Sequence, residues 1–256
     1  MKNKFLAITM IGIITAIYSC QTPADEKRTP IDSAVTALPA DLQKPLKEKV
    51  LTAAEQNALT PDMVIQSMKD GNRRFMNNNL TLRDHSAQVR SASSGQYPKA
   101  VILSCLDSRI PVEDVFDKGI GDLFVARVAG NFANVDILGS MEFGCKVSGA
   151  KLILVLGHKS CGAIKAAIDQ VKLGNITSML TKIEPAVVMS KDFPGEKISK
   201  NDAYVEEVAK NNIRNTIKTI QQRSPILKEM ADKGEIKIVG AYYDLNTGEV
   251  NIMDGN

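Results

Sequence analysis

The sequence contains no tryptophan, and aromatic residues make up only 5% of its 256 positions. A hydrophobic core must therefore be built mainly from Val, Ile, Leu, Ala and Met. Four cysteines are too few for a scaffold held together by disulfides, so each thiol needs its own explanation. Neither sign of charge is in large excess, because 32 Lys and Arg stand against 29 Asp and Glu. With no long basic block, the charge gives no reason to expect a nucleic-acid partner.

The first apolar run is too short for a permanent membrane-spanning helix, which needs about 20 apolar residues. This run, Phe5–Ile17, has 13 residues and follows two lysines, a pattern typical of a secretory signal. The letters IYSC come next and resemble the lipobox of bacterial lipoproteins, whose cysteine is lipidated and becomes the mature N-terminus. We therefore expect residues 1–19 to be a cleaved signal peptide and Cys20 to carry a lipid anchor. An ordinary signal peptide that happens to contain this cysteine is the alternative.

These features predict an exported protein on the periplasmic or cell-surface side, held to a membrane only through its lipid. Residues 20–60 carry four prolines and scattered charges, which favours a tether or N-terminal extension. Residues 61–256 then form a single domain that is large enough to bury a core.

Short apolar runs alternate with helical patterns along this domain. Strands are expected at residues 100–104, 123–128, 151–156 and 236–243, with a last short strand ending near residue 253. Longer helices are expected at residues 61–77, 134–147, 161–171, 176–189 and 202–222, with helical turns at 111–116 and from 225. This alternation predicts an α/β fold, with a mostly parallel central sheet of four to five strands flanked by helices.

The chemically reactive residues follow two of the predicted strands. Cys105, Asp107 and Arg109 come after the first strand, and His158 and Cys161 come after the third. Because ligands bind at the carboxyl ends of parallel strands, we expect these side chains to share one site. Two sulfurs and one nitrogen form a ligand set for zinc that leaves the fourth position open, as in catalytic zinc sites. Asp107 and Arg109 are close enough in sequence to form a charge-assisted pair.

Simpler explanations apply to some of these thiols. Cys145 lies in an apolar helical pattern and is best interpreted as a small buried hydrophobic residue. A disulfide between Cys105 and Cys161 is conceivable in an exported protein. It would leave His158 and the predicted Asp–Arg pair without a role.

The two motifs, Cys-x-Asp-x-Arg at residues 105–109 and His-x-x-Cys-Gly at residues 158–162, resemble those of the β-class carbonic anhydrases. Matching segments also include residues 108–113, 121–124, 127–131 and 239–245, so that the resemblance spans nearly the whole domain. It implies reversible hydration of CO2 to bicarbonate and a proton, the activity of a carbonate dehydratase.

The resemblance implies one Zn²⁺ per chain, held by Cys105, His158 and Cys161, with a water or hydroxide as the fourth ligand. Asp107 would orient the hydroxide toward CO2, and Arg109 would keep Asp107 ionised and in place. In some members of the family the aspartate instead occupies the fourth zinc position and closes the site, and the sequence leaves that choice open for Asp107.

The substrate pocket is implied in the same way. Gln96 and the Gly162 amide would donate hydrogen bonds to the substrate, while Phe124 and Ala129 would form an apolar wall. Phe143 stands where the family often has Tyr, so a hydroxyl is missing there. The family builds this pocket across a dimer interface, which implies a homodimer or tetramer. For His85, a surface or capping role is favoured over a role in proton transfer.

Two other functions remain open from the sequence. A hydrolase of carbonyl sulfide or carbon disulfide would use the same fold and zinc. A zinc- or bicarbonate-binding lipoprotein without turnover would belong to a different class of protein, although it would have no need of the Asp107–Arg109 pair.

Overall fold

The computed structural model describes residues 49–253. The expected signal peptide, Cys20 and most of the 20–60 extension lie outside the described residues, so those predictions stay predictions. None of the helices between residues 49 and 253 is both long enough and apolar enough to cross a bilayer.

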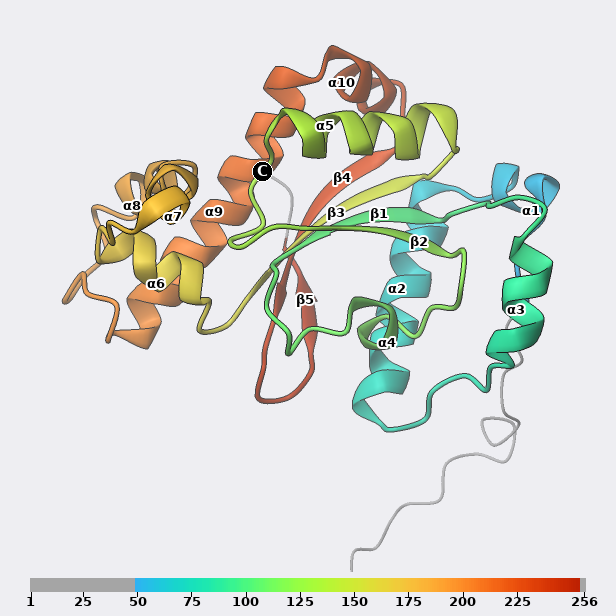
Figure 1. The fold of residues 1–256 in the computed structure, drawn as a ribbon, viewed down its shortest axis with the longest axis horizontal. Helices are drawn as coiled ribbons and strands as arrows, with labels where there is room; N and C mark the ends of the chain where they lie inside the picture. The colour runs from blue at the N-terminus through green and yellow to red at the C-terminus, as the bar shows by residue number, and fades with distance from the viewer. Residues whose placement is uncertain (1–48, 254–256) are drawn as a thin grey trace, which may run out of the picture. The chain divides into compact units, whose positions relative to one another are not determined.

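A five-stranded sheet with the order β2-β1-β3-β4-β5 forms the centre of the fold (Figure 1). The strands are β1 Ala100–Ser104, β2 Leu123–Arg127, β3 Leu152–His158, β4 Lys237–Tyr243 and β5 Val250–Ile252. Neighbouring strands pair in parallel except β5, which is antiparallel to β4. Every residue of β1 and β3 is buried, which explains why both read as uninterrupted apolar runs. The predicted fold class is confirmed.

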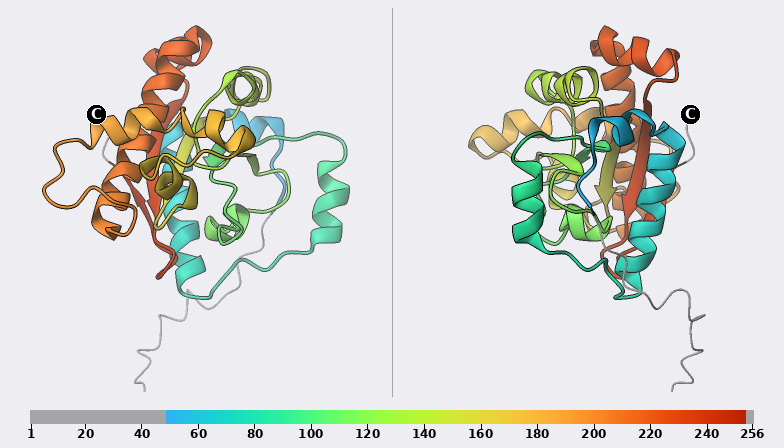
Figure 2. Two further views of the ribbon diagram at one scale, coloured as in Figure 1. Left: turned by 60° about the vertical axis from the view of Figure 1, so that its left-hand side comes forward. Right: turned by 90° about the vertical axis from the view of Figure 1, so that its right-hand side faces the viewer.

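Helices cover both faces of this sheet (Figure 2). They are α1 Ala53–Asn57, α2 Pro61–Met76, α3 His85–Ala92, α4 Val112–Val115, α5 Val135–Glu142, α6 Gly162–Ile168, α7 Gly174–Leu180, α8 Glu184–Met189, α9 Asp202–Arg223 and α10 Pro225–Asp232. The long helix α9 packs so closely on β3 and β4 that a Cβ added at Gly157 or Gly240 would lie under 3 Å from Ile213. Helix α2 lies on the opposite face of the sheet.

Three local features differ from the sequence-based expectations. The helix expected at residues 134–147 changes into a π-helix, η2, over Phe143–Val147. The helix expected at 176–189 is wrong as a single element, since the chain forms α7 and α8 with a break before Pro185. Helix α3 is additional, and it begins at His85 with Asp84 as its N-cap. His85 is exposed there, on the surface.

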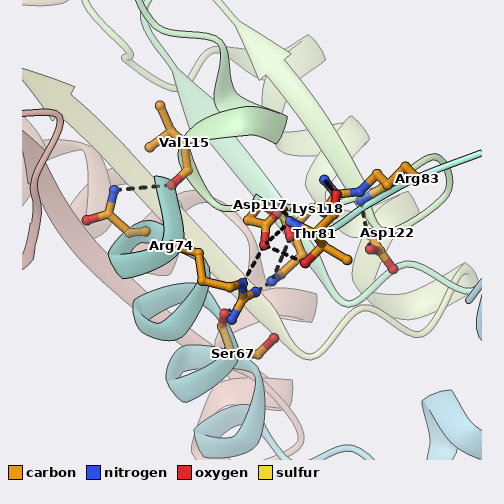
Figure 3. Close-up of polar contacts among 10 residues, drawn as sticks. Ser67, Arg74, Thr81, Arg83, Val115, Asp117, Lys118 and Asp122 are labelled. Atoms are coloured by element: carbon orange, nitrogen blue, oxygen red, sulfur yellow. Dashed lines mark hydrogen bonds and ion pairs between the residues drawn. The ribbon is translucent and has the colours of Figure 1, made fainter. Parts of the chain in front are cut away.

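A buried carboxylate, Asp117, ties the segment between α2 and α3 to the loop after α4 (Figure 3). Its oxygens accept hydrogen bonds from the Thr81 backbone N–H at 3.1 Å and the Thr81 hydroxyl at 2.6 Å. The guanidinium groups of Arg83, at 2.7 Å, and of Arg74 also bind it. Burial alone raises the pKa of Asp117, but these bonds outweigh it and hold the pKa at about 2. Asp117 is therefore an ionised anchor for the segment.

Candidate metal centre

The parallel register of β1 and β3 brings the two reactive motifs together. Ser104, the last residue of β1, pairs with Leu156 of β3, so Cys105 and His158 lie at the same end of the sheet, where the parallel strands finish. Strand β3 extends two residues beyond its predicted end, and His158 is its last residue. Cys161 is the residue that precedes α6. The carboxyl ends of two strands and the start of one helix therefore form the site, as expected for a parallel sheet.

Cys105, His158 and Cys161 form one buried cluster, with their ligand atoms all within 4.8 Å of one another. The two sulfurs lie 3.9 Å apart and are not joined by a disulfide. Two thiolates bound to one tetrahedral Zn²⁺ at about 2.3 Å would have their sulfurs about 3.8 Å apart. The spacing and the donor set both fit zinc.

The imidazole of His158 has the orientation and tautomer of a metal ligand. Its Nδ1 lies 2.9 Å from the carbonyl oxygen of Lys159, and a nitrogen facing a carbonyl must carry the proton. Nε2 is then left with a lone pair, and within the described residues it is buried without a hydrogen-bond partner. A ring held by a backbone carbonyl at one nitrogen, with the other free, is typical of histidine ligands.

The two thiols of the cluster differ in acidity. The pKa of Cys105 lies well below its usual range because the Cys161 thiol and the Gly130 and Asp107 amides hydrogen-bond its sulfur. The adjacent Cys105 and burial raise the pKa of Cys161. A second thiolate next to the first is therefore unfavourable unless a cation is present. For comparison, burial alone raises the pKa of Cys145, outside the cluster, to about 12.

Asp107 is clamped at the edge of the cluster by Arg109. The guanidinium donates to both carboxylate oxygens, with Nε at 2.9 Å from Oδ1 and Nη2 at 2.7 Å from Oδ2, and the Arg109 backbone N–H adds a third bond. Oδ2 also lies 3.9 Å from Nε2 of His158. The hydrogen bonds from Arg109 hold the pKa of this carboxyl well below its usual range. Asp107 is therefore an ionised, oriented acceptor.

Two further groups hold the loop that carries Cys105 and Asp107. Arg127, at the end of β2, donates to the carbonyl of Cys105 at 2.9 Å and to that of Asp107 at 2.6 Å. The backbone N–H of Gly130 donates to the Cys105 sulfur at 3.3 Å. The loop is therefore fixed from β2 and from the turn that follows it.

The structure separates the expected pocket residues into two groups. Ala129 precedes the amide that contacts the Cys105 sulfur, and Gly162 follows Cys161 directly, so both belong to the cluster's surroundings. Gln96 is exposed and precedes β1, whereas Cys105 follows it. The five residues of β1, about 16 Å long at about 3.3 Å per residue, therefore lie between Gln96 and Cys105 along the chain.

Phe124 and Phe143 are also remote from the metal cluster. They pack edge to face, with ring centroids 6.4 Å apart, and line a cavity of about 640 Å³ between β2, α5 and η2. None of the residues lining this cavity belongs to the cluster, and Val101 in its wall lies at the start of β1. Phe143 and Val135 are more than half exposed there, on the edge strand's side.

Sequence reasoning did not detect the contribution of α9 to this site. The side chain of Asn212 donates to the Gly130 carbonyl at 2.7 Å, and the Thr216 hydroxyl donates to the Asn131 carbonyl at 3.3 Å. Both residues lie more than 80 positions from the turn that they bind. The available signal was weak: polar residues on the buried side of an amphipathic helix.

A buried Cys–His–Cys cluster beside a clamped aspartate, at the carboxyl ends of a parallel sheet, is the arrangement of a metal-dependent α/β enzyme. The sequence model of the carbonic anhydrase family matches residues 100–250. Carbonic anhydrase 2 of Mycobacterium tuberculosis is 32% identical over 195 residues, which cover 74% of this chain and 91% of that protein. The carbonic anhydrase of Mycolicibacterium smegmatis is 33% identical over 193 residues, covering 73% and 90%. This chain belongs to the carbonic anhydrase family.

Solved structures assign it to the β-class fold. The β-carbonic anhydrase CcaA superposes with a TM-score of 0.61 at 26% identity, covering 75% of this chain and 88% of that one. A tetrameric β-carbonic anhydrase from Sordaria macrospora gives a TM-score of 0.59 at 20% identity over 65% of this chain and 85% of that one, a likeness of fold. The β-class resemblance predicted from the two sequence motifs is confirmed.

Proposed function

We propose that the protein is a zinc-dependent carbonic anhydrase that interconverts CO2 and bicarbonate plus a proton, with one Zn²⁺ per chain. The observation that carries this proposal is the buried Cys105–His158–Cys161 cluster beside a clamped Asp107, in a chain of this family. Zn²⁺ held by the three ligands would lower the pKa of a water in its open position to about 7, making hydroxide available at neutral pH.

Asp107 supplies the orienting acceptor for the attacking oxygen. Oδ2 faces the cluster, and a hydroxyl proton donated to it would direct that oxygen's lone pair toward the carbon of CO2. Arg109 prevents the carboxylate from rotating and keeps it ionised, because it occupies both oxygens. In this proposal the substrate contacts the Gly162 amide, next to Cys161, and the Ala129 methyl group, next to Gly130.

A second copy of the chain completes the pocket in this proposal. Gln96 precedes the start of β1, whereas Cys105 follows its end, and the two phenylalanines line a cavity at the edge strand β2 that contains no residue of the cluster. A homodimer or a tetramer that places this cavity against the partner's metal centre would supply the missing apolar wall. The tetrameric relative from Sordaria macrospora supports such an assembly.

Removing one metal ligand tests the proposal. Cys161→Ser is expected to lose the bound zinc and to lower the rate of CO2 hydration about 1,000-fold or more, because the nucleophile depends on the metal. Zinc is measured by elemental analysis and hydration by stopped-flow with a pH indicator. Cys145→Ala changes a buried thiol outside the cluster and should retain about one zinc per chain and full activity.

Two results would contradict this assignment. A wild-type protein that binds zinc but does not hydrate CO2 would point to carbonyl sulfide or carbon disulfide as the substrate, to be assayed next. A wild-type protein that binds no zinc under reducing conditions would remove the metal-dependent mechanism altogether.

We also propose that the enzyme is exported and lipid-anchored through Cys20, on the basis of the N-terminal pattern of two lysines, an apolar run and IYSC. Full-length protein is expected to sediment with membranes and to incorporate labelled fatty acid. Cys20→Ser should remove the label and shift the protein to the soluble exported fraction or leave its signal uncleaved. An unlabelled wild-type protein in the soluble fraction would exclude the anchor.

A further inference from the structure

The turn that follows β2 has an unusual backbone and a direct contact with the metal cluster. Gly130 and Asn131 both have positive φ angles, +83° and +40°, a region that glycine adopts freely and asparagine tolerates better than most residues. This conformation directs the Gly130 N–H to the Cys105 sulfur at 3.3 Å. The turn therefore determines a hydrogen bond to one of the three candidate zinc ligands.

Helix α9 binds this turn through two buried side chains. The Asn212 amide donates to the Gly130 carbonyl at 2.7 Å. Both backbone polar groups of Gly130 are therefore hydrogen-bonded, the N–H to the Cys105 sulfur and the carbonyl to α9. One helical turn further along, the Thr216 hydroxyl donates to the Asn131 carbonyl at 3.3 Å. Asn212 and Thr216 are almost completely buried.

The turn is also tightly packed against Ile183. A Cβ at Gly130 would lie 2.4 Å from Cδ1 of Ile183, so side-chain packing prevents the turn from moving in that direction. The position of the Gly130 N–H thus depends on packing against Ile183 and on two hydrogen bonds from α9 to the turn.

Packing alone does not explain an asparagine at position 212. Its Oδ1 is buried and, within the described residues, has no hydrogen-bond partner, which is unfavourable in a core. A leucine of similar volume would avoid that cost. What the amide contributes is its donor to Gly130, which points to a role in the geometry of the site.

We propose that Asn212, supported by Thr216, is a positioning residue of the metal centre, acting through Gly130 on the Cys105 thiolate. The hydrogen bond from Gly130 stabilises the negative charge on the sulfur and directs its lone pairs, and loss of the α9 donor releases the turn. Outer contacts of this kind contribute about 10- to 100-fold to metal affinity. The inference rests on the proposed function, since it concerns zinc binding.

The test compares Asn212→Leu with Asn211→Leu. Asn211 is the adjacent buried residue of α9, and its amide binds Ser190 and Glu207 away from the cluster. Asn212→Leu is expected to weaken zinc binding about 10- to 100-fold in a competition titration with a chelating dye, and to shift the sulfur-to-metal charge-transfer band of the Co²⁺-substituted protein. Asn211→Leu should leave both measurements unchanged, even if it lowers the melting temperature.

Thr216 provides a second pair of variants. Thr216→Ser keeps the hydroxyl and should bind zinc like the wild type, whereas the isosteric Thr216→Val should weaken binding in the same direction as Asn212→Leu. This pair decides the question if Asn212→Leu does not fold.

The possible failures can be told apart. Wild-type zinc affinity and an unshifted Co²⁺ spectrum in both Asn212→Leu and Thr216→Val would overturn the positioning role and leave the proposed function intact. If the wild-type protein itself binds neither zinc nor Co²⁺, the proposed function has failed, and this inference fails with it.

Discussion

Asp107→Asn is expected to lower kcat for CO2 hydration about 100-fold or more while one zinc per chain stays bound, because misplacing a reacting group by about 1 Å costs about 10²-fold. The substitution keeps the shape of the side chain but removes its charge. An amide offers the attacking hydroxyl either a donor or a weaker acceptor, and it no longer forms the two-point ion pair with Arg109. Since Asp107 is not part of the Cys–His–Cys cluster, the metal should remain.

The measurement combines stopped-flow hydration with zinc analysis on the same sample. Asp114→Asn is the matched control, since Asp114 is an exposed carboxylate on α4 outside the candidate metal cluster. It should hydrate CO2 at the wild-type rate. Equal rates for Asp107→Asn and the wild type would show that this carboxylate does not orient the nucleophile. A loss of zinc in Asp107→Asn would instead assign it a role in metal binding.

Asp117→Asn should lower the free energy of unfolding by about 3 kcal/mol, within the range for breaking a buried ion pair. The carboxylate is completely buried, and two guanidinium groups would lose their counter-charge. Asn has nearly the same size and tolerates the left-handed backbone at this position, where φ is 48°, so the charge is the main change. For a domain of this size the melting temperature should fall by roughly 6–12 °C.

The pH dependence of stability offers a second readout for Asp117. Its pKa is about 2 in the folded protein, below the value of about 3.9 in an unfolded chain. The unfolded state therefore takes up the proton first, so the ionised carboxylate stabilises the fold above about pH 4 and this contribution is lost as the pH falls toward 2. The free energy of unfolding of Asp117→Asn should therefore fall less than that of the wild type as the pH is lowered.

Denaturant unfolding at pH 7 and at pH 3 measures both effects, with Asp70→Asn as the control. Asp70 pairs with Arg73 on the exposed side of α2, and exposed pairs contribute about 0–1 kcal/mol. An Asp117→Asn protein as stable as the control at pH 7 would show that the buried ion pairs contribute no net stability.

The main strands and helices could be predicted from the sequence because each is a local pattern. Strand β1 was predicted at its observed bounds, since four apolar residues between Lys99 and Ser104 leave little choice. Helix α2 begins as predicted, with Thr60 as N-cap and Pro61 in the first turn. Helix α3 was missed because its eight residues contain few apolar side chains to show a period. The π-helix η2 also has no simple signature in the sequence.

The family and the candidate ligands were determined by the sequence itself. Cysteine, histidine and aspartate at fixed spacings after two strands restrict the chemistry, because few residue types bind zinc and parallel strand ends converge. These inferences depend on residue identity and on local order, both of which can be read from the chain without any coordinates.

The tertiary structure alone decided how those residues are held and which of them meet. Packing of distant segments determines three of these features: the 3.9 Å between the two sulfurs, the contact of Asn212 with Gly130, and the separation of Gln96 from Cys105 by β1. Asn212 lies 82 residues after Gly130, and no local pattern encodes a contact over such a distance. It exists because α9 packs against the sheet next to the turn, and that position results from the whole core rather than from any one segment.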